Sequence, residues 1–297
     1  MKIVTAIDSF KGSMTSIEAG NAFSDGFHRV FPDARIIVRP LADGGEGTVE
    51  ALTNGMNGHL EHVTVSGPFG QPVDCAYGLI QDSMTAVIEM SGAAGITLVP
   101  AEDLNPLKAT TYGVGEVIAD AIKKGCRHFI IGIGGSATND GGAGMLQALG
   151  FGLLDDDGRE IPRGAEGLEK LAVITTDQVI PELSECTFRI ACDVTNPLCG
   201  SNGCSSVFGP QKGAGPEDIE KMDRCLARYA KVARALHPDA DPEFPGTGAA
   251  GGMGFAFRTF LPAKLESGIQ IVLEETRLES YLKDADLIIT GEGRLDC

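Results

Sequence analysis

Carboxylate side chains follow several short apolar segments of this 297-residue chain, each in a polar, glycine-containing loop. In open α/β sheets, ligands bind at the carboxyl ends of the parallel strands. Carboxylates gathered there could surround a metal ion and a phosphate group, because Mg²⁺ prefers oxygen ligands. Each loop alone could be an ordinary turn, since Asp and Gly are common turn residues, but their recurrence favours a shared site. The carboxylates are Asp8, Asp43, Glu46, Asp140, Asp193, Glu292 and Asp296.

The most informative local segment is the glycine-rich run 134–142, between a predicted strand over 128–133 and a predicted helix over 143–149. Glycines let backbone N–H groups approach an anion, and a helix N-terminus adds favourable partial charge. The hydroxyl and amide side chains of the run could donate hydrogen bonds to phosphate oxygens. A tight turn with a helix cap is the alternative interpretation. The candidate anion-binding residues are Gly134, Gly135, Ser136, Thr138, Asn139 and Asp140.

Three basic residues could neutralise a bound phosphate or carboxylate. Lys11 follows the first predicted strand and stands beside a glycine, where its ammonium group would suit a phosphate. Arg294 could pair with a carboxylate or phosphate through two parallel hydrogen bonds. Lys212 is a weaker candidate of the same kind, and each of the three could instead be a solvated surface residue. The glycine-rich segment 246–254 could line the substrate site, or it could be flexible packing.

The run 132–137 also matches the Gly-x-Gly-x-x-Gly/Ala form of dinucleotide-binding loops, and Asp155 follows roughly 20 residues later. A NAD(P)-dependent dehydrogenase therefore stays open as an alternative, although residues 139–142 interrupt the expected start of the helix. The sequence contains no Gly-x4-Gly-Lys-Ser/Thr motif, which excludes a P-loop kinase. No histidine accompanies a Ser or Cys in a recognisable nucleophile motif, so we expect no hydrolase triad.

The charge balance excludes two classes of partner. Lys and Arg number 24 against 41 Asp and Glu, for a net charge of −17. A nucleic-acid or membrane binder needs a basic surface, so we expect neither partner. The eight cysteines are dispersed without a Cys-x-x-Cys pair, which fits free thiols in a reducing cytoplasm. The chain shows no signal peptide and no apolar run near the about 20 residues that span a bilayer, and we expect a cytoplasmic protein.

Alternating strands and helices must position these loops. Strands predicted over 2–7 and 34–38 flank a helix over 17–30 with Ser16 as its cap, which is the start of a parallel α/β sheet. Short predicted strands at 60–65, 75–80 and 85–89 indicate a second, mixed α/β unit. The remaining predicted elements are helices from 111 to 122 and over 216–236, and strands over 188–191 and 285–290.

Taken together, these segments resemble the bacterial glycerate kinase family, which is related to glycerate 2-kinases. The matching stretches follow one another along the whole chain, at 8–13, 42–48, 134–142, 192–198, 208–214, 248–252 and 291–296. The resemblance implies an α/β fold of two domains, one flavodoxin-like with a parallel sheet and one with a mixed sheet, and an active site in the cleft between them. We expect residues 1–60 and 280–297 in the first and 61–279 in the second. Family members are longer, so the flavodoxin-like sheet is expected to be incomplete at the C-terminus.

The resemblance also implies a reaction, the transfer of the γ-phosphoryl group of ATP to a hydroxyl of D-glycerate, with 2-phosphoglycerate as the favoured product. In phosphoryl transfer the protein mainly positions the reactants and stabilises charge. We expect the backbone of 134–136 and the side chain of Thr138 to hold the ATP phosphates. Mg²⁺ would be held by Asp193 with Glu292 or Asp296.

The remaining expected roles concern the acceptor. Asp8 or Asp43 would take or orient the substrate hydroxyl proton. Lys11 and Arg294 would pair with the glycerate carboxylate or the transferring phosphoryl group. A non-catalytic nucleotide or metabolite sensor is a further alternative, but a binder of anions gains nothing from many carboxylates. The sequence leaves a homo-oligomer open.

Overall fold

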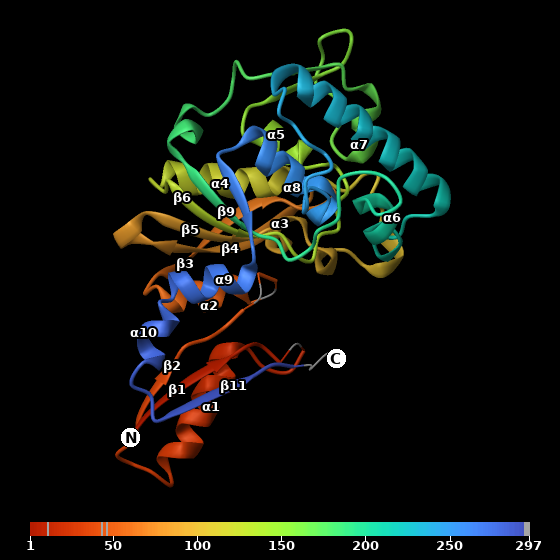
Figure 1. The fold of residues 1–297 in the computed structure, drawn as a ribbon. Helices are drawn as coiled ribbons and strands as arrows, with labels where there is room; N and C mark the ends of the chain where they lie inside the picture. The colour runs from red at the N-terminus through yellow and green to blue at the C-terminus, as the bar shows by residue number, and fades with distance from the viewer. Residues whose placement is uncertain (11, 43, 46, 294–297) are drawn as a thin grey trace.

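The computed structural model of the chain describes residues 1–10, 12–42, 44–45 and 47–293. Two sheets organise it, a three-stranded sheet in the lower part of Figure 1 and a six-stranded sheet in the upper part. A separate two-stranded sheet pairs β7 (Gly152–Leu154) with β8 (Val173–Thr175). The predicted α/β class with parallel and mixed sheets is confirmed.

The smaller sheet draws its parallel strands from both ends of the chain. Its order is β2 (Arg35–Val38), β1 (Lys2–Ile7), β11 (Leu287–Gly291). This is how the first three strands of a flavodoxin-like sheet are arranged. The crossover helix α1 (Ser16–His28) packs on β1 and β2.

The cap of α1 differs from the prediction. Thr15, not Ser16, is the N-cap, because Thr15 and Glu18 form a reciprocal capping box. The Thr15 hydroxyl accepts from the Glu18 backbone N–H at 3.2 Å, and the Glu18 carboxylate accepts from the Thr15 N–H at 2.8 Å.

The larger sheet is mixed, with β3, β4 and β5 antiparallel and β5, β6, β9 and β10 parallel. The parallel strands end in register, since Glu89 pairs with Gly132, and Gly132 with Ala191. The segments that follow β5, β6 and β9 therefore leave the sheet at one edge. The strands in spatial order are β3 (His59–Ser66), β4 (Pro72–Ile80), β5 (Thr85–Glu89), β6 (His128–Gly132), β9 (Thr187–Ala191) and β10 (Ala263–Glu266).

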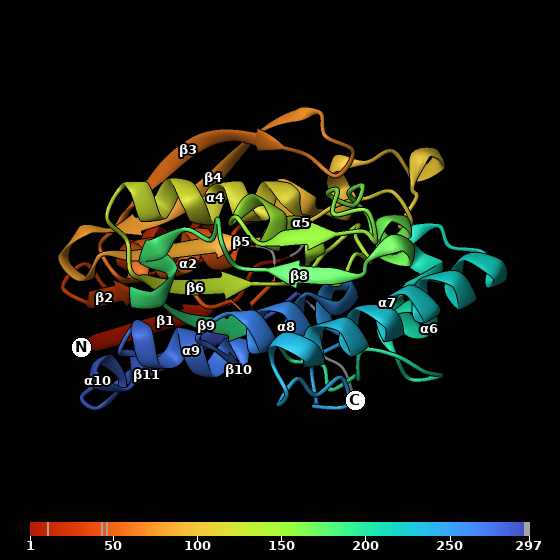
Figure 2. The same ribbon diagram turned by 90° about the horizontal axis from the view of Figure 1, so that it is seen from above.

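Helices cover both faces of the larger sheet, because its buried strand residues alternate between two apolar clusters. Figure 2 shows α4 and α8 running along the strands on one face. The helices associated with this face are α3 (Ser91–Ala94), α4 (Tyr112–Lys123), α5 (Ala143–Ala148), α6 (Cys204–Phe208), α7 (Pro216–Leu236) and α8 (Ala249–Phe260).

The other face of the larger sheet is covered by α2 (Thr48–Gly55) and α9 (Gly268–Glu275). In Figure 1 these helices and α10 (Leu278–Leu282) lie between the two sheets. The chain thus crosses between the sheets twice, once from β2 to α2 and once from α9 to β11. A division into two domains, with boundaries near residues 60 and 279, stays our proposal.

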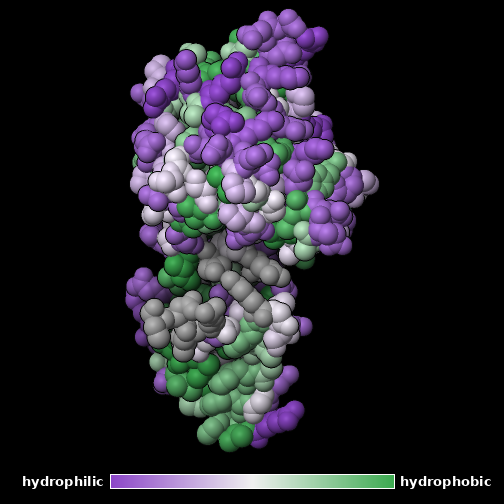
Figure 3. All heavy atoms as spheres, turned by 90° about the vertical axis from the view of Figure 1, so that its right-hand side faces the viewer, coloured by the Kyte–Doolittle hydropathy of each residue, from purple (hydrophilic) through white to green (hydrophobic). Residues whose placement is uncertain are grey.

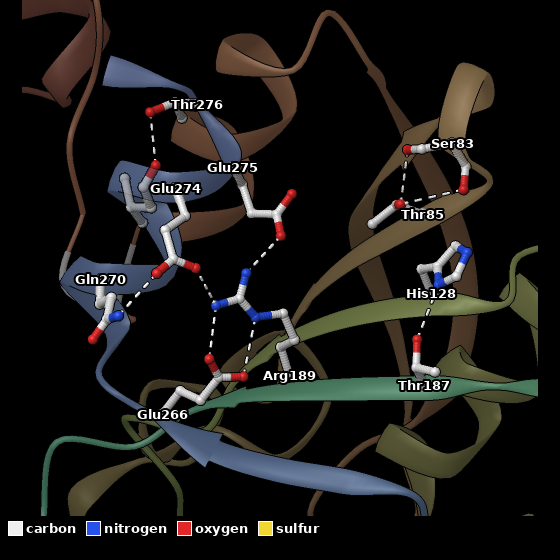
Figure 4. A network of polar contacts seen from close by, with 11 residues as sticks. Ser83, Thr85, His128, Thr187, Arg189, Glu266, Gln270, Glu274, Glu275 and Thr276 are labelled. Carbon is white, nitrogen blue, oxygen red and sulfur yellow. Dashed lines mark hydrogen bonds and ion pairs between the residues drawn. The ribbon is translucent and has the colours of Figure 1, made fainter. Parts of the chain in front are cut away.

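A charged cluster joins β9, β10 and α9 (Figure 4). The Arg189 guanidinium donates to both carboxylate oxygens of Glu266, at 3.0 and 2.7 Å. It also donates to Glu275 and Glu274, each at 2.7 Å. The hydrogen bonds to Glu266 raise the pKa of Arg189 most, and those to Glu274 and Glu275 add to the rise. Partial burial acts in the opposite direction.

The two parts of the molecule differ at their surfaces. Figure 3 shows hydrophilic side chains over much of the upper part and hydrophobic ones gathered on the lower part. The exposed large hydrophobic residues in and around the smaller sheet include Val30, Phe31, Leu287 and Ile288. Among the described residues, no helix is both long enough and apolar enough to cross a bilayer.

Candidate active site

A cavity of about 430 Å³ opens at the edge where the parallel strands of the larger sheet end. Its walls come from the segments after β6 and β9, from the connection before α2, from the region after α6 and from the start of α8. The residues that line the cavity include Gly44, Gly134, Gly135, Ser136, Asp193 and Lys212.

The segment after β6 brings bare backbone to the cavity. Gly132 has to be glycine, because a Cβ atom there would lie 2.5 Å from the carbonyl oxygen of Gly44. Gly135 has a φ of 72°, which glycine adopts without strain. Within the described part of the chain, the N–H groups of Gly134, Gly135 and Ser136 donate to no protein acceptor. Three such donors in the wall of a cavity could bind an anion.

The Lys212 side chain reaches this loop from the region after α6. Lys212 is only 1% exposed, and its Nζ donates to Ser136 Oγ at 2.7 Å and to the Thr138 carbonyl oxygen at 2.6 Å. Burial lowers the pKa of Lys212 to about 8, while Cys204 and Asp140 act in the opposite direction. Lys212, the weaker candidate of the sequence analysis, is therefore a buried residue of the cavity wall.

The second half of the glycine-rich loop lies beneath the cavity, not on its surface. Thr138, Asn139 and Asp140 are fully buried. Asp140 accepts hydrogen bonds from the backbone N–H groups of Thr111, Gly142 and Gly144 at 2.8, 3.1 and 3.2 Å. Burial raises the pKa of Asp140, and these hydrogen bonds oppose the rise. In this structure Asp140 anchors the loop to α4 and α5.

Asp193 follows β9 and stands exposed on the cavity rim. Its carboxylate accepts from the backbone N–H of Gly268, at 3.1 Å to Oδ1, where α9 begins. The positive end of the α9 dipole favours a carboxylate here. The remaining lone pairs of Asp193 could bind a cation that also touches a phosphate in the cavity.

Two further predicted carboxylates belong to the smaller sheet. β1 and β11 pair in register up to Ile7 and Gly291, so Asp8 and Glu292 follow at the same edge. The Asp8 N–H donates to the Gly291 carbonyl oxygen at 2.9 Å, and the Asp8 carboxylate accepts from the Ser9 N–H at 2.6 Å. The other predicted site residues, Lys11, Asp43, Glu46, Arg294 and Asp296, lie outside the described residues. Among the described residues, no three His, Cys, Asp or Glu side chains form a metal cluster.

Comparison with known proteins identifies the family. The model of the glycerate kinase family matches residues 3–297. The chain belongs to the glycerate kinase family. It is 50% identical to glycerate 2-kinase of Escherichia coli (strain K12) over 297 residues, covering all of this chain and 78% of that protein. It is 48% identical over 296 residues to glycerate kinase of Bacillus subtilis (strain 168), again covering 78% of the relative.

A solved structure shares the fold throughout. The crystal structure of a protein assigned as glycerate kinase 2, from Salmonella typhimurium LT2, superposes with a TM-score of 0.95 at 51% identity. The match covers all of this chain and 79% of that one. The family resemblance inferred from the motifs is thus confirmed.

The dinucleotide-binding alternative finds no support in this family fold. Residues 133–142 separate β6 from α5, whereas a dinucleotide-binding loop opens its helix directly. Asp155 caps its own turn before β8, accepting from the N–H groups of Asp157 and Arg159 at 3.0 and 2.9 Å. Asp155 therefore does not take the place of the ribose-binding carboxylate.

Sequence reasoning passed over one carboxylate that the fold brings to the same edge. Glu89 ends β5, in register with Gly132. Its Oε1 accepts from the Val49 N–H at 2.8 Å, in the first turn of α2. A local pattern was present in the sequence, because Glu89 also comes at the end of an apolar strand. Its hydrogen-bond partner Val49 is 40 residues away, however, and no neighbouring residue marked Glu89 as part of a site.

Proposed function

We propose that this protein transfers the γ-phosphoryl group of ATP to a hydroxyl of D-glycerate, with 2-phosphoglycerate as the product. The observation that carries the proposal is the row of unpartnered N–H groups from Gly134 to Ser136 at the mouth of the cavity. These donors suit phosphate oxygens. The close similarity to proteins named glycerate 2-kinase and glycerate kinase supports the choice of substrate.

The site residues divide into donor-binding and metal-binding groups. The Gly134–Ser136 backbone would hold the ATP phosphates, and Thr138 to Asp140 would keep this loop in place from below. Asp193 fits Mg²⁺, because it is exposed on the rim and its one described partner is a backbone N–H. Mg²⁺ usually uses one or two carboxylates together with substrate phosphates, so Asp193 with Glu292 or Asp296 would suffice. When bound, Mg²⁺ would neutralise charge that develops on the γ-phosphoryl group.

The acceptor side of the proposal rests on residues that follow β1, β2 and β11. Asp8 or Asp43 would take or orient the proton of the attacking hydroxyl, and Lys11 and Arg294 would pair with the glycerate carboxylate. Because ATP is the donor, we place the reaction in the cytoplasm, where thiols such as the seven free cysteines among the described residues stay reduced.

Phosphorus NMR of the products tests the proposal directly. Protein, ATP, Mg²⁺ and D-glycerate are mixed, with a parallel sample lacking D-glycerate. A phosphoglycerate signal whose coupling places the phosphate on oxygen 2, absent from the parallel sample, is the expected result. A signal from oxygen 3 would refute the product assignment. ATP binding without any phosphoglycerate would instead indicate a nucleotide sensor.

A further inference from the structure

The cavity wall contains a buried positive charge, the ammonium group of Lys212. Lys212 Nζ contacts two neutral acceptors, a hydroxyl and a carbonyl oxygen. Among the described residues, no carboxylate lies within ion-pair distance of it. Asp140 is near enough to raise its pKa, but the oxygens of Asp140 accept from Thr111, Gly142 and Gly144. Burying an ammonium ion without a counter-charge is costly, so its retention requires compensation.

The position of Lys212 indicates what that compensation is. An ammonium group has three N–H donors, and the protein uses two of those on Lys212. Because Ser136 Oγ accepts from Lys212, the Ser136 hydroxyl hydrogen is left to donate elsewhere. Both residues line the same cavity as Gly134 and Gly135, whose N–H groups have no acceptor among the described residues. The cavity wall therefore combines several donors with one full positive charge.

We infer that Lys212 is a catalytic residue whose ammonium group binds the terminal phosphate of ATP and stabilises it during transfer. The inference rests on the proposed function. In the transfer, the glycerate hydroxyl oxygen forms a bond to the γ-phosphorus, and the bond from that phosphorus to the β–γ bridging oxygen breaks. ADP leaves, and the hydroxyl proton passes to the acceptor-side carboxylate. Lys212 keeps its protons throughout and acts by its charge.

A purely structural role makes different predictions. If Lys212 only clamps the 134–138 loop, its removal should destabilise the fold and disturb all ligands alike. If it serves as a charge for phosphate, Lys212→Met should change the free energy of unfolding little, because removing a costly buried ion offsets the loss of its two hydrogen bonds. The affinity for ATP should then fall while the affinity for adenosine, which carries no phosphate, stays unchanged.

The experiment compares the wild type with Lys212→Met, Lys212→Arg and the control Lys231→Met. Lys231 is exposed on α7 and has no ion pair among the described residues. Calorimetry measures ATP and adenosine binding, and steady-state kinetics measure kcat and the KM for D-glycerate. We expect kcat of Lys212→Met to fall by roughly 10²–10³-fold, with the KM for D-glycerate little changed. Lys212→Arg should retain part of the ATP affinity, and Lys231→Met should match the wild type.

The pH profile of the wild type provides a test that needs no variant. Since Lys212 has a pKa of about 8 and must be protonated to act, kcat/KM for ATP should fall as pH rises through about 8. The groups that face it, Asp140 and Cys204, do not produce this limb. Asp140 is a carboxylate, and burial raises the pKa of Cys204 to about 11. A flat profile between pH 7 and 9.5 would overturn the assignment, even if Lys212→Met failed to fold.

The outcomes separate this inference from the proposed function. Phosphoglycerate formation with ATP affinity and kcat insensitive to Lys212 would overturn the inference alone. ATP affinity that depends on Lys212 and on pH, without phosphoglycerate formation, would remove the proposed function and leave Lys212 as a phosphate-binding residue. Absence of ATP binding to the wild type would overturn both.

Discussion

The substitution Asp140→Asn tests whether this carboxylate anchors the glycine-rich loop or binds the ligand. Oδ2 of Asp140 accepts from the N–H and hydroxyl of Thr111 at 2.8 and 3.0 Å and from the Gly144 N–H, while Oδ1 accepts from the Gly142 N–H. An asparagine that keeps the first set of bonds must turn its amide NH₂ towards the Gly142 N–H. That buried N–H then loses its acceptor, and the remaining bonds lose the assistance of the negative charge.

The expected loss of stability follows from these contacts. A buried N–H without an acceptor costs about 1–3 kcal/mol. The remaining hydrogen bonds become weaker without the negative charge, but a neutral amide also costs less to bury than a carboxylate, and these two effects partly cancel. We therefore expect a free energy of unfolding lower by about 1–3 kcal/mol. For chains of 150–250 residues each kcal/mol shifts Tm by roughly 2–4 °C, and this longer chain should shift somewhat less.

Denaturant unfolding followed by circular dichroism measures this loss, with Asp177→Asn as the matched control. Asp177 is exposed and has no ion pair among the described residues, so its substitution should leave stability unchanged. ATP affinity is measured on the same samples below their melting range. Asp140→Asn with unaltered stability and much weaker ATP binding would refute the anchoring role, because it would show that Asp140 contacts the ligand directly.

Three further predictions concern charge. Arg189→Met should lower the free energy of unfolding by on the order of 1–2 kcal/mol, because it removes the pairs with Glu266 and Glu275, whose side chains are a quarter exposed or more. This loss should be smaller in 1 M salt, and the control Arg224→Met should show no loss. Asp193→Asn should abolish most turnover while Tm hardly changes, because the amide oxygen can still accept from α9; intact turnover would disprove the metal assignment. The pKa of Lys212 is lowered from 10.5 to about 8 in the native state, so between these pH values the native state binds fewer protons than the unfolded state. The free energy of unfolding of the wild type should therefore rise with pH across this window, and Lys212→Met should lack the rise.

Local signals in the sequence were sufficient for several elements. The helix predicted over 216–236 is observed as α7 (Pro216–Leu236), because proline suits the first turn and apolar residues recur at helical spacing. The predicted strands over 2–7 and 85–89 also agree with β1 and β5. Each of these segments forms its element from properties of its own residues.

Helix α8 was missed for a physical reason. The sequence favours a loop over 246–254, but α8 begins at Ala249 and continues to Phe260. Its first turn contains Ala250, Gly251 and Gly252 in left-handed conformations, with φ values of 53°, 67° and 93°. Tertiary packing selects this turn, because a Cβ atom on Gly251 would lie 2.1 Å from the Thr138 carbonyl oxygen. No helix propensity encodes a contact across more than 100 residues.

The candidate site, like the fold, could be predicted from the sequence only in part. The strand–loop–helix pattern was enough to predict that 134–142 forms a loop at the carboxyl edge of a sheet. It could not show which half of the loop faces the cavity, because that depends on Thr111 and Ser205, which hold Asp140 and Asn139 in the interior. The burial of Lys212 depends on partners 74 and 76 residues away, so its local sequence resembled that of a surface lysine.

Several features of the cavity wall are unfavourable for the protein without a ligand. Lys212 buries a charge that contacts no carboxylate among the described residues. Gly134 and Gly135 are exposed beside it, and their N–H groups are free to bind water or a ligand. Ala250, beside them, holds a left-handed backbone that costs a non-glycine residue about 1 kcal/mol or more. The buried charge and the free donors lie in the wall of the same cavity, and one anion would pair with both. A scaffold selected for stability alone could replace Lys212 by an apolar residue, which would remove the cost of the charge. Their coincidence at the end of the parallel strands is therefore the main physical support for the proposed phosphate site in this cavity.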